Sequence, residues 1–357
     1  MTVPSQMTES TDMALIRSQV DATLAGFLDH KAREAAADGF PSEIIEVLRD
    51  FVFAGGKRLR PLLCVVGWHA AGGKELPESV VRVATCLEMF HAFALIHDDI
   101  MDNSHTRRGA PTVHRALATR YAARSDAAQL GVNAAIVIGD LALAWSDEIL
   151  HTAGLTSAQL AHVLPVVDRM RTEIVRGQYL DLLATGQPSP DTDRALDIAR
   201  YKTAKYTVER PLHIGATLAG ASVAVLDALS AYALPIGEAF QLRDDLLGTF
   251  GTVNTGKSRV DDLTGGKHTI LITLALRNAT DPQRQALHAL LGDPHLDEEG
   301  ADQVRHLVTV TGASDEAEEM IRTRHVRALR ALKQGAFPPA ATTALRYLAD
   351  ASIARNA

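Results

Sequence analysis

Apolar residues recur every three or four positions along most of the chain, which is the spacing of the buried face of an α-helix. Between residues 14 and 37 this spacing is combined with many Ala, Leu, Arg and Glu residues, which favour helices. Pro41, Ser42 and Glu43 then mark a helix start, and the predicted helix runs to about Phe53. Because alternating strand patterns with turn signals are missing, the chain is predicted to be all-α.

The segment 78–103 is apolar on most sides, which is typical of a helix in the middle of a bundle. Glycine and proline clusters such as 186–190 separate the helical segments from one another. The other predicted helices span residues 61–68, 127–153, 157–183, 192–207, 211–218, 224–249 and 267–278, with three more at the C-terminal end. Since neither an internal repeat nor a domain boundary is visible, we predict one helical domain over residues 13–357, after a disordered tail of residues 1–12.

The composition is that of an ordinary soluble protein. The net charge of -7 argues against a general nucleic-acid binder, because such proteins carry a basic face. Cys64 and Cys86 sit in apolar stretches and fit neither metal-ligand nor disulfide spacing, so both are predicted to be buried small hydrophobic residues. The polar start lacks the features of a signal peptide, and no uninterrupted apolar run reaches membrane-spanning length. A cytoplasmic protein without a membrane span is therefore expected.

Three carboxylates lie at the end of the apolar segment 78–103, in the sequence LIHDDIMD. Asp98 and Asp102 are four residues apart and share one helix face, about 6 Å from each other. Like charges at that distance repel, and Mg²⁺ would relieve the repulsion, since it binds one or two carboxylates and completes its shell with water and substrate phosphate. A solvated acidic helix end is the alternative. Arg107 and Arg108 follow on a turn and favour a metal–phosphate site, because arginine pairs well with phosphate oxygens.

A second apolar helix ends in the sequence FQLRDDLLG, with Asp244 and Asp245. Helix bundles build metal sites between facing helices, so the two aspartate pairs predict opposite walls of one site. A second exposed acidic patch is the alternative. The sequence GGKRLRP places three cations beside two glycines at a helix entry, where backbone and helix dipole can approach an anion. The polar, glycine-bearing stretch 251–266 is predicted to be a functional loop, such as a lid.

Taken in this order, the motifs GGKRLRP, LIHDDIMD, RRGAPTVH, YKTAKYT, FQLRDDLLG and GGKHT resemble those of the trans-isoprenyl diphosphate synthases, also called polyprenyl synthetases. The resemblance runs from about Gly55 to Thr269. It implies a large single-domain helical bundle around a central deep cavity, assembled as a homodimer. It also implies Mg²⁺-dependent, head-to-tail condensation of isopentenyl diphosphate with an allylic diphosphate. The family is expected to use three Mg²⁺ ions per active site, which Mn²⁺ can replace.

The resemblance also implies a role for each residue that matches a motif. The isopentenyl diphosphate is expected to be bound by Lys57, Arg60, His91 and Arg108. The allylic diphosphate is expected to contact Arg107, Lys202, Lys257 and Lys267. Mg²⁺ is expected on Asp98, Asp102 and Asp244, with Asp99 and Asp245 ordering metal-bound water. Thr203 and Gln241 would lie near the reacting carbons, where their oxygens stabilise an allylic cation without trapping it.

Four positions bear on activity and product. Gly248 stands where the second motif of the family often has a third aspartate, but an active enzyme is still expected because the other motifs are intact. In the family, the residues just before Asp98 line the pocket for the hydrocarbon tail. Ala94 lies one turn before Asp98, roughly 6 Å along the helix axis. A small Ala94 beside the single aromatic Phe93 resembles geranylgeranyl diphosphate synthases, so a C20 product is expected, with farnesyl diphosphate as the nearest alternative. Longer products are not expected, because Phe93 and Phe90 occupy that wall.

Two other functions share part of this pattern. A class I terpene cyclase also uses a DDxxD motif on helices, but it binds one diphosphate and would leave GGKRLRP unexplained. A non-catalytic partner subunit that regulates an active synthase is the second alternative. The complete set of basic motifs favours an active synthase over both.

Overall fold

The computed structural model describes residues 12–251 and 261–354 and confirms the predicted all-α fold. The chain first forms α1 (Met13–Asp38), α2 (Ser42–Phe53), α3 (Leu59–Ala70), α4 (Glu78–Met101), a hairpin of β1 (Thr106–Arg107) and β2 (Ala110–Pro111), α5 (Val113–Arg120) and α6 (Ala127–His151). It continues through α7 (Ser157–Ala184), α8 (Thr192–Ala199), the π-helix η2 (Arg200–Glu209), α9 (Arg210–Leu218) and α10 (Val223–Phe250). The last part contains α11 (Asp261–Thr264), α12 (Ile270–Asn278), α13 (Asp281–Leu290), α14 (Glu298–Val310), α15 (Ala313–Gln334) and α16 (Pro339–Ile353).

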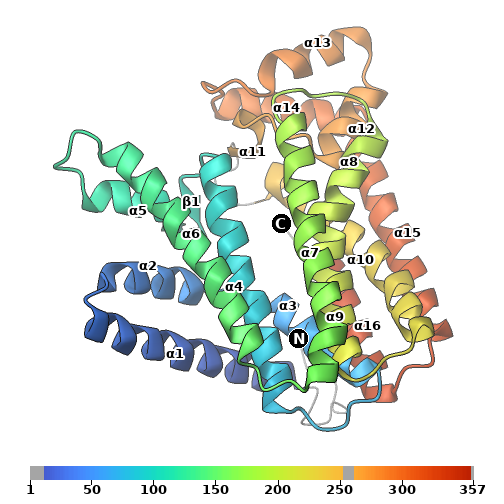
Figure 1. Cartoon of the computed structure of the whole chain (residues 1–357). Helices are drawn as coiled ribbons and strands as arrows, with labels where there is room; N and C mark the ends of the chain where they lie inside the picture. The colour runs from blue at the N-terminus through green and yellow to red at the C-terminus, as the bar shows by residue number, and fades with distance from the viewer. Residues whose placement is uncertain (1–11, 252–260, 355–357) are drawn as a thin grey trace.

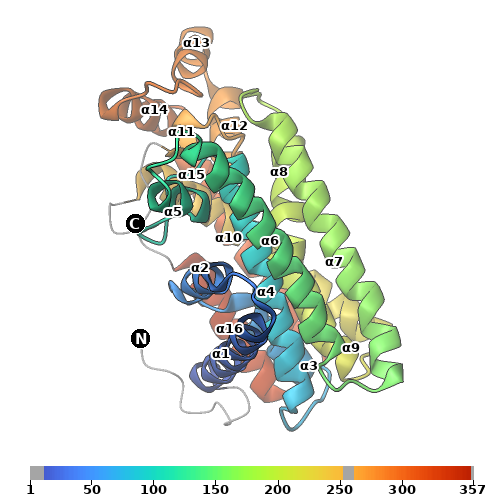
Figure 2. The same ribbon diagram turned by 60° about the vertical axis from the view of Figure 1, so that its left-hand side comes forward.

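Helix α4 lies inside the bundle, as its apolar pattern predicts. It packs along α6, whereas η2 packs between α7 and α10 (Figure 1). Helices α1 and α2 cover the opposite side of α4 from α7, and α13 and α14 lie at one end of the bundle in both views (Figures 1 and 2). Cys64 and Cys86 are both buried, as predicted, and burial raises the pKa of the Cys86 thiol to about 12.

Most predicted helices agree with the structure to within a few residues, and four differences stand out. The segment 192–207 is not one helix but α8 followed by the π-helix η2. The wider turns of a π-helix change the spacing of apolar residues only slightly, so the sequence pattern does not distinguish them from α-helical turns. Four helices, not three, follow α12, and the short α5 was not predicted. Asp12, which was assigned to the N-terminal tail, accepts a hydrogen bond from the amide of Ala14 at 2.8 Å and caps α1. Residues 1–11 and Lys257 lie outside the described residues.

Three of the described helices are long and apolar enough to cross a membrane, judged by length and composition alone. They are α4, α6 and α10. Within α4, 67% of the apolar window is buried inside the bundle, whereas only 28% of the α6 window is buried, so α6 presents an apolar face outward. The prediction of no membrane span rested on the absence of an uninterrupted apolar run, and it stays a prediction.

Candidate active site

A cavity of about 1240 Å³ lies between α3 and α4 on one side and α7, η2 and α10 on the other. Its lining contains the predicted substrate-binding and metal-binding residues that the structure describes, except Asp102, and it also leaves out Asp99, which was expected to order metal-bound water. The charged residues near Asp98 gather at the C-terminal end of α4, and Phe93 and Ala94 line the cavity about one turn earlier on that helix. Residues from α3, α4, β1, α7, α8, η2, α10 and α12 thus line one space, and the motifs that are far apart in the sequence meet there.

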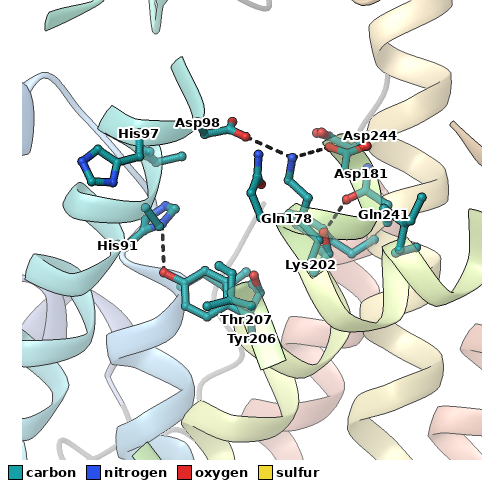
Figure 3. A pocket seen from close by; sticks show the side chains of 18 of the residues that line it. His91, His97, Asp98, Gln178, Asp181, Lys202, Tyr206, Thr207, Gln241 and Asp244 are labelled. Carbon is teal, nitrogen blue, oxygen red and sulfur yellow. Dashed lines mark hydrogen bonds and ion pairs between the residues drawn. The ribbon is translucent and has the colours of Figure 1, made fainter. Parts of the chain in front are cut away.

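Lys202 connects the first acidic motif to α7. Its ammonium group donates hydrogen bonds to Asp98 at 3.0 Å and to Asp181 at 2.6 Å (Figure 3). Burial alone would raise the pKa of Asp98, but the charges of Lys202, Lys267 and Arg107 outweigh burial and hold that pKa well below its usual value. Asp98 is therefore a carboxylate at neutral pH, and its oxygens can accept hydrogen bonds or bind a cation.

The other two carboxylates of the first motif have different partners. Asp99 is 1% exposed and accepts hydrogen bonds from the Nε atom of Arg107 at 2.8 and 2.9 Å, so it fixes the arginine rather than facing the cavity. Burial raises the pKa of Asp99, and the hydrogen bonds from Arg107 oppose that effect. Asp102 pairs with Lys267 at 2.7 Å, and its pKa is raised by burial and by the charge of Asp98. The first motif therefore contains one carboxyl group with a lowered pKa, Asp98, and two with raised pKa values, Asp99 and Asp102.

Helix α10 forms the second wall. Asp244 lines the cavity across from Asp98, with Lys202 between them (Figure 3). One turn earlier, Gln241 accepts a hydrogen bond from the Thr203 hydroxyl at 2.5 Å, and its amide donates to Asp245 at 2.8 Å. The other oxygen of Asp245 accepts the amide of Ile270 at 3.0 Å, which ties α10 to the start of α12. The orientation of the Gln241 side chain is therefore fixed at both ends.

The basic residues of GGKRLRP and of the hairpin form a separate group on the same cavity. Arg60 donates to the Thr207 hydroxyl at 2.6 Å, and its guanidinium lies 4.2 Å from the ring centre of Tyr206. Arg108 donates to the carbonyl oxygen of Gly55. A Cβ atom on Gly56 would lie 3.0 Å from the Arg108 guanidinium, and the φ of +133° also favours glycine there. The glycine pair thus lets the loop approach the arginine closely.

His91 lies beside this basic group and lines the same cavity. Its Nδ1 atom is 3.3 Å from the Tyr206 hydroxyl. Burial and the charges of Arg60 and Arg108 place the pKa of His91 well below its usual value. His91 is therefore a neutral imidazole that can exchange hydrogen bonds with an anion but adds no charge.

The apolar part of the cavity agrees with the predicted tail pocket in two of three residues. Phe93 and Ala94 both line the cavity. Phe90, which was expected on the same wall, is not among the lining residues; it packs behind Phe93 with ring centres 5.2 Å apart. His97 was not predicted here, but its ring lies 4.8 Å from that of Phe93 in an edge-on contact. Ala94 is thus the smallest side chain of α4 beside the first acidic motif and the one with room for a ligand.

The carboxylates of the cavity fit a divalent cation that brings other ligands with it. In the described parts of the chain, no three His, Cys, Asp or Glu side chains are close enough to form a metal site by themselves. Asp98 and Asp244, two of the carboxylates that line the cavity, supply the hard oxygen ligands that Mg²⁺ prefers. Because Mg²⁺ commonly binds one or two carboxylates and takes its other ligands from water and phosphate, these residues fit an ion that arrives with a phosphorylated substrate.

The sequence prediction missed several polar residues of this site, and two of them lie together on α7. Gln178 and Asp181 on α7 both line the cavity, and Asp181 is a direct partner of Lys202. The signal was present in the segment GQYLDL, where two polar residues three positions apart share one helix face beside apolar neighbours. Lys257, which was predicted to contact the allylic diphosphate, lies outside the described residues.

The fold and site together define a helical-bundle protein whose cavity joins an acidic group, two basic groups and an apolar pocket. The sequence profile of the polyprenyl synthetase family matches residues 41–308. The chain belongs to the polyprenyl synthetase family and is a short-chain prenyltransferase that depends on a divalent metal ion. This membership favours the enzyme over the terpene cyclase and the non-catalytic subunit.

Individual relatives agree with this classification. The crystal structure of geranylgeranyl pyrophosphate synthase from Corynebacterium glutamicum, complexed with isoprenyl diphosphate and magnesium, superposes with a TM-score of 0.91 at 39% identity, over 96% of this chain and 98% of that one. Geranylfarnesyl diphosphate synthase of Aeropyrum pernix is 33% identical over 75% of this chain and 80% of its own length. A (2E,6E)-farnesyl diphosphate synthase of Mycobacterium bovis is 36% identical over 61% of this chain and 56% of its own length. The relatives therefore differ in the product that their names give.

Proposed function

We propose that the chain condenses isopentenyl diphosphate with allylic diphosphates and releases geranylgeranyl diphosphate, the C20 product. The observation that carries the product length is the tail pocket before Asp98. Ala94 lines the cavity there, and Phe93, backed by Phe90 and His97, is the aromatic side chain of α4 that limits it. The likeness to a protein named geranylgeranyl pyrophosphate synthase supports the same length.

The acidic and basic groups suit the two diphosphates differently. Mg²⁺ would neutralise the charge of the allylic diphosphate and make pyrophosphate a better leaving group. Asp98, Asp102 and Asp244 are proposed to hold the ions, three per site, and Mn²⁺ is proposed to replace them. Lys202 lies between the two acidic walls, so a small shift from Asp98 or Asp181 would let its ammonium group donate to a diphosphate oxygen.

The basic group on the other side of the cavity is proposed to bind isopentenyl diphosphate. It contains Lys57, Arg60, His91 and Arg108. Arg107 and Lys267 lie nearer to the first acidic motif and are assigned to the allylic diphosphate. Two diphosphates bound by separate groups hold their hydrocarbon parts in one cavity, which replaces a collision in solution by a fixed approach.

The reaction requires a pocket that keeps water away from the allylic cation, and it does not require a nucleophilic side chain. The allylic C–O bond breaks, pyrophosphate leaves with the electron pair, and the alkene of isopentenyl diphosphate forms the new C–C bond. A proton is finally lost to the released pyrophosphate. Thr203 and Gln241 place oxygen atoms beside the cation, and their mutual hydrogen bond of 2.5 Å fixes them without creating an attacking group.

The proposal is tested by incubating the purified chain with Mg²⁺, isopentenyl diphosphate and a C5, C10 or C15 allylic diphosphate. We expect geranylgeranyl diphosphate as the main product from each primer and loss of turnover when a chelator removes the metal ion. A main product of another length would overturn the C20 assignment. A cyclic hydrocarbon from geranylgeranyl diphosphate alone would support the terpene cyclase instead, and absence of pyrophosphate release would support the non-catalytic subunit.

A homodimer joined through α6 and α7 is part of the proposal. Ile136 and Val137 on α6 are 40% and 56% exposed, and Val175 and Tyr179 on α7 are 60% and 62% exposed. Such apolar side chains favour a second copy of the chain as their cover.

The dimer is tested by sedimentation. We expect sedimentation at twice the chain mass, and a Val137→Glu variant that sediments as a monomer. A monomeric wild-type chain that floats with lipid vesicles would instead assign this face to a membrane and contradict the cytoplasmic location, which stays a prediction.

A further inference from the structure

The π-helix η2 is held between two glycines from neighbouring helices. A Cβ atom on Gly177 of α7 would lie 2.4 Å from the amide nitrogen of Lys202. A Cβ atom on Gly237 of α10 would lie 2.5 Å from the Cα atom of Ala204. Real Cβ contacts are almost never this short, and the facing atoms belong to the backbone, which cannot turn away as a flexible side chain can. Both helices therefore approach η2 as closely as they do because neither has a side chain at these two positions.

Each glycine lies one helical turn before the residue that pairs with η2 at the active site. Gly177 precedes Asp181 by four positions, and Asp181 accepts a hydrogen bond from Lys202 at 2.6 Å. Gly237 precedes Gln241 by four positions, and Gln241 accepts a hydrogen bond from Thr203 at 2.5 Å. Residues four apart share a helix face, so close approach at the glycine brings the next turn within hydrogen-bonding distance.

Ion pairs fix the other end of the same π-helix. Glu173, one turn before Gly177 on α7, pairs with Lys205 at 3.2 Å and with Arg210, the first residue of α9, at 2.6 Å. The segment from Lys202 to Arg210 thus has charged contacts at its end and backbone contacts at the glycines. Single-turn widening by a π-helix often occurs at functional sites, where it turns side chains that an α-helix would point elsewhere.

From this arrangement we propose that Gly177 and Gly237 are positioning residues, which place Lys202 and Thr203 for ionisation of the allylic diphosphate. The inference rests on the proposed function of the cavity and concerns only the acidic side of it. The group of basic residues assigned to isopentenyl diphosphate comes mainly from α3, α4 and the hairpin, which neither glycine contacts. The same group contacts η2 only further along, at Tyr206 and Thr207. A methyl group at either glycine should therefore affect the allylic substrate much more than isopentenyl diphosphate.

The test compares Gly177→Ala and Gly237→Ala with the wild-type chain. A misplacement of about 1 Å at a catalytic group can lower a rate by about 100-fold, so we expect kcat to fall between about 10- and 100-fold. The KM for isopentenyl diphosphate should stay within about twofold of the wild-type value. Calorimetry should show weaker binding of pyrophosphate with Mg²⁺. The loss from Gly177→Ala should largely disappear when Lys202 is already replaced by alanine.

Gly131→Ala on α6 is the matched control. A Cβ atom there would lie 2.3 Å from the carbonyl oxygen of His114, an equally short backbone contact, but Gly131 does not line the cavity. It should lower the melting temperature as the test variants do, with kcat per folded chain unchanged. If both test variants keep the wild-type kcat and pyrophosphate binding, or lose only the folded fraction as the control does, the positioning role is wrong.

Two further measurements keep the inference open to contradiction. If the alanine variants do not fold, Ala204→Gly adds no atom and loosens η2 beside Gly237; a fall in kcat of several-fold supports the inference, and an unchanged kcat overturns it. Pyrophosphate binding reports the placement of Lys202 without turnover. A wild-type chain that binds pyrophosphate but does not condense the substrates would therefore overturn the proposed function alone, while the glycine variants still decide the positioning role.

Discussion

Asp98→Ala is expected to lower kcat by at least about 1000-fold. The loss of metal-ion stabilisation at a leaving group is worth several kcal/mol, and each 1.36 kcal/mol changes the rate tenfold. Asp98 is the carboxylate of the first motif that lines the cavity, and the surrounding cations keep its pKa low, so it is the strongest candidate for a direct metal ligand. The measurement is pyrophosphate release at saturating substrate over a range of Mg²⁺ concentrations.

The fold should tolerate this change. Lys202 keeps its contact with Asp181 at 2.6 Å, and removing Asp98 also removes a like charge that raises the pKa of Asp99 and Asp102. Asp168→Ala on α7 is a matched control, because Asp168 is exposed and does not line the cavity; it should keep the wild-type kcat. Near-full activity of Asp98→Ala in a folded chain would contradict the metal role.

The two acidic walls could be predicted from the sequence because the aspartates of each wall lie close together in the sequence, at the end of one helix. Asp98 and Asp102 at i and i+4, at the end of an apolar helix, share a face by helix geometry alone. The partners of these carboxylates could not be predicted in the same way. Lys267 pairs with Asp102 across 165 positions of the chain, and that contact depends on where the fold places the segment before α12 relative to the end of α4.

The π-helix is the clearest case of a feature that sequence periodicity does not detect. Segment 192–207 has a helical apolar pattern, and a turn that is wider by one residue changes that pattern too little to be noticed. In the sequence alone, Gly177 and Gly237 appear only as residues that weaken a helix. The structure explains them, because the backbone of η2 lies directly against each glycine. Each glycine is required by a contact with a different helix of the bundle, and the sequence does not show which helices are in contact.

Ala94→Phe is expected to change the main product from C20 to C15. Ala94 lines the cavity one turn before Asp98, and a phenyl ring there would fill space that the last isoprene unit of the growing tail needs. Protein interiors are closely packed, so a ring cannot be added without excluding other atoms. The measurement is product-length analysis with labelled isopentenyl diphosphate and each of the three primers.

The reciprocal variant gives this prediction its control. Phe93→Ala should lengthen the product, because it removes the aromatic side chain that limits the same pocket, although Phe90 and His97 remain behind it. Opposite shifts from two neighbouring residues cannot come from general damage to the enzyme, which would lower turnover without a direction in product length. An unchanged C20 product from Ala94→Phe would show that the tail runs elsewhere in the cavity, for example along Ile174 and Val175 of α7.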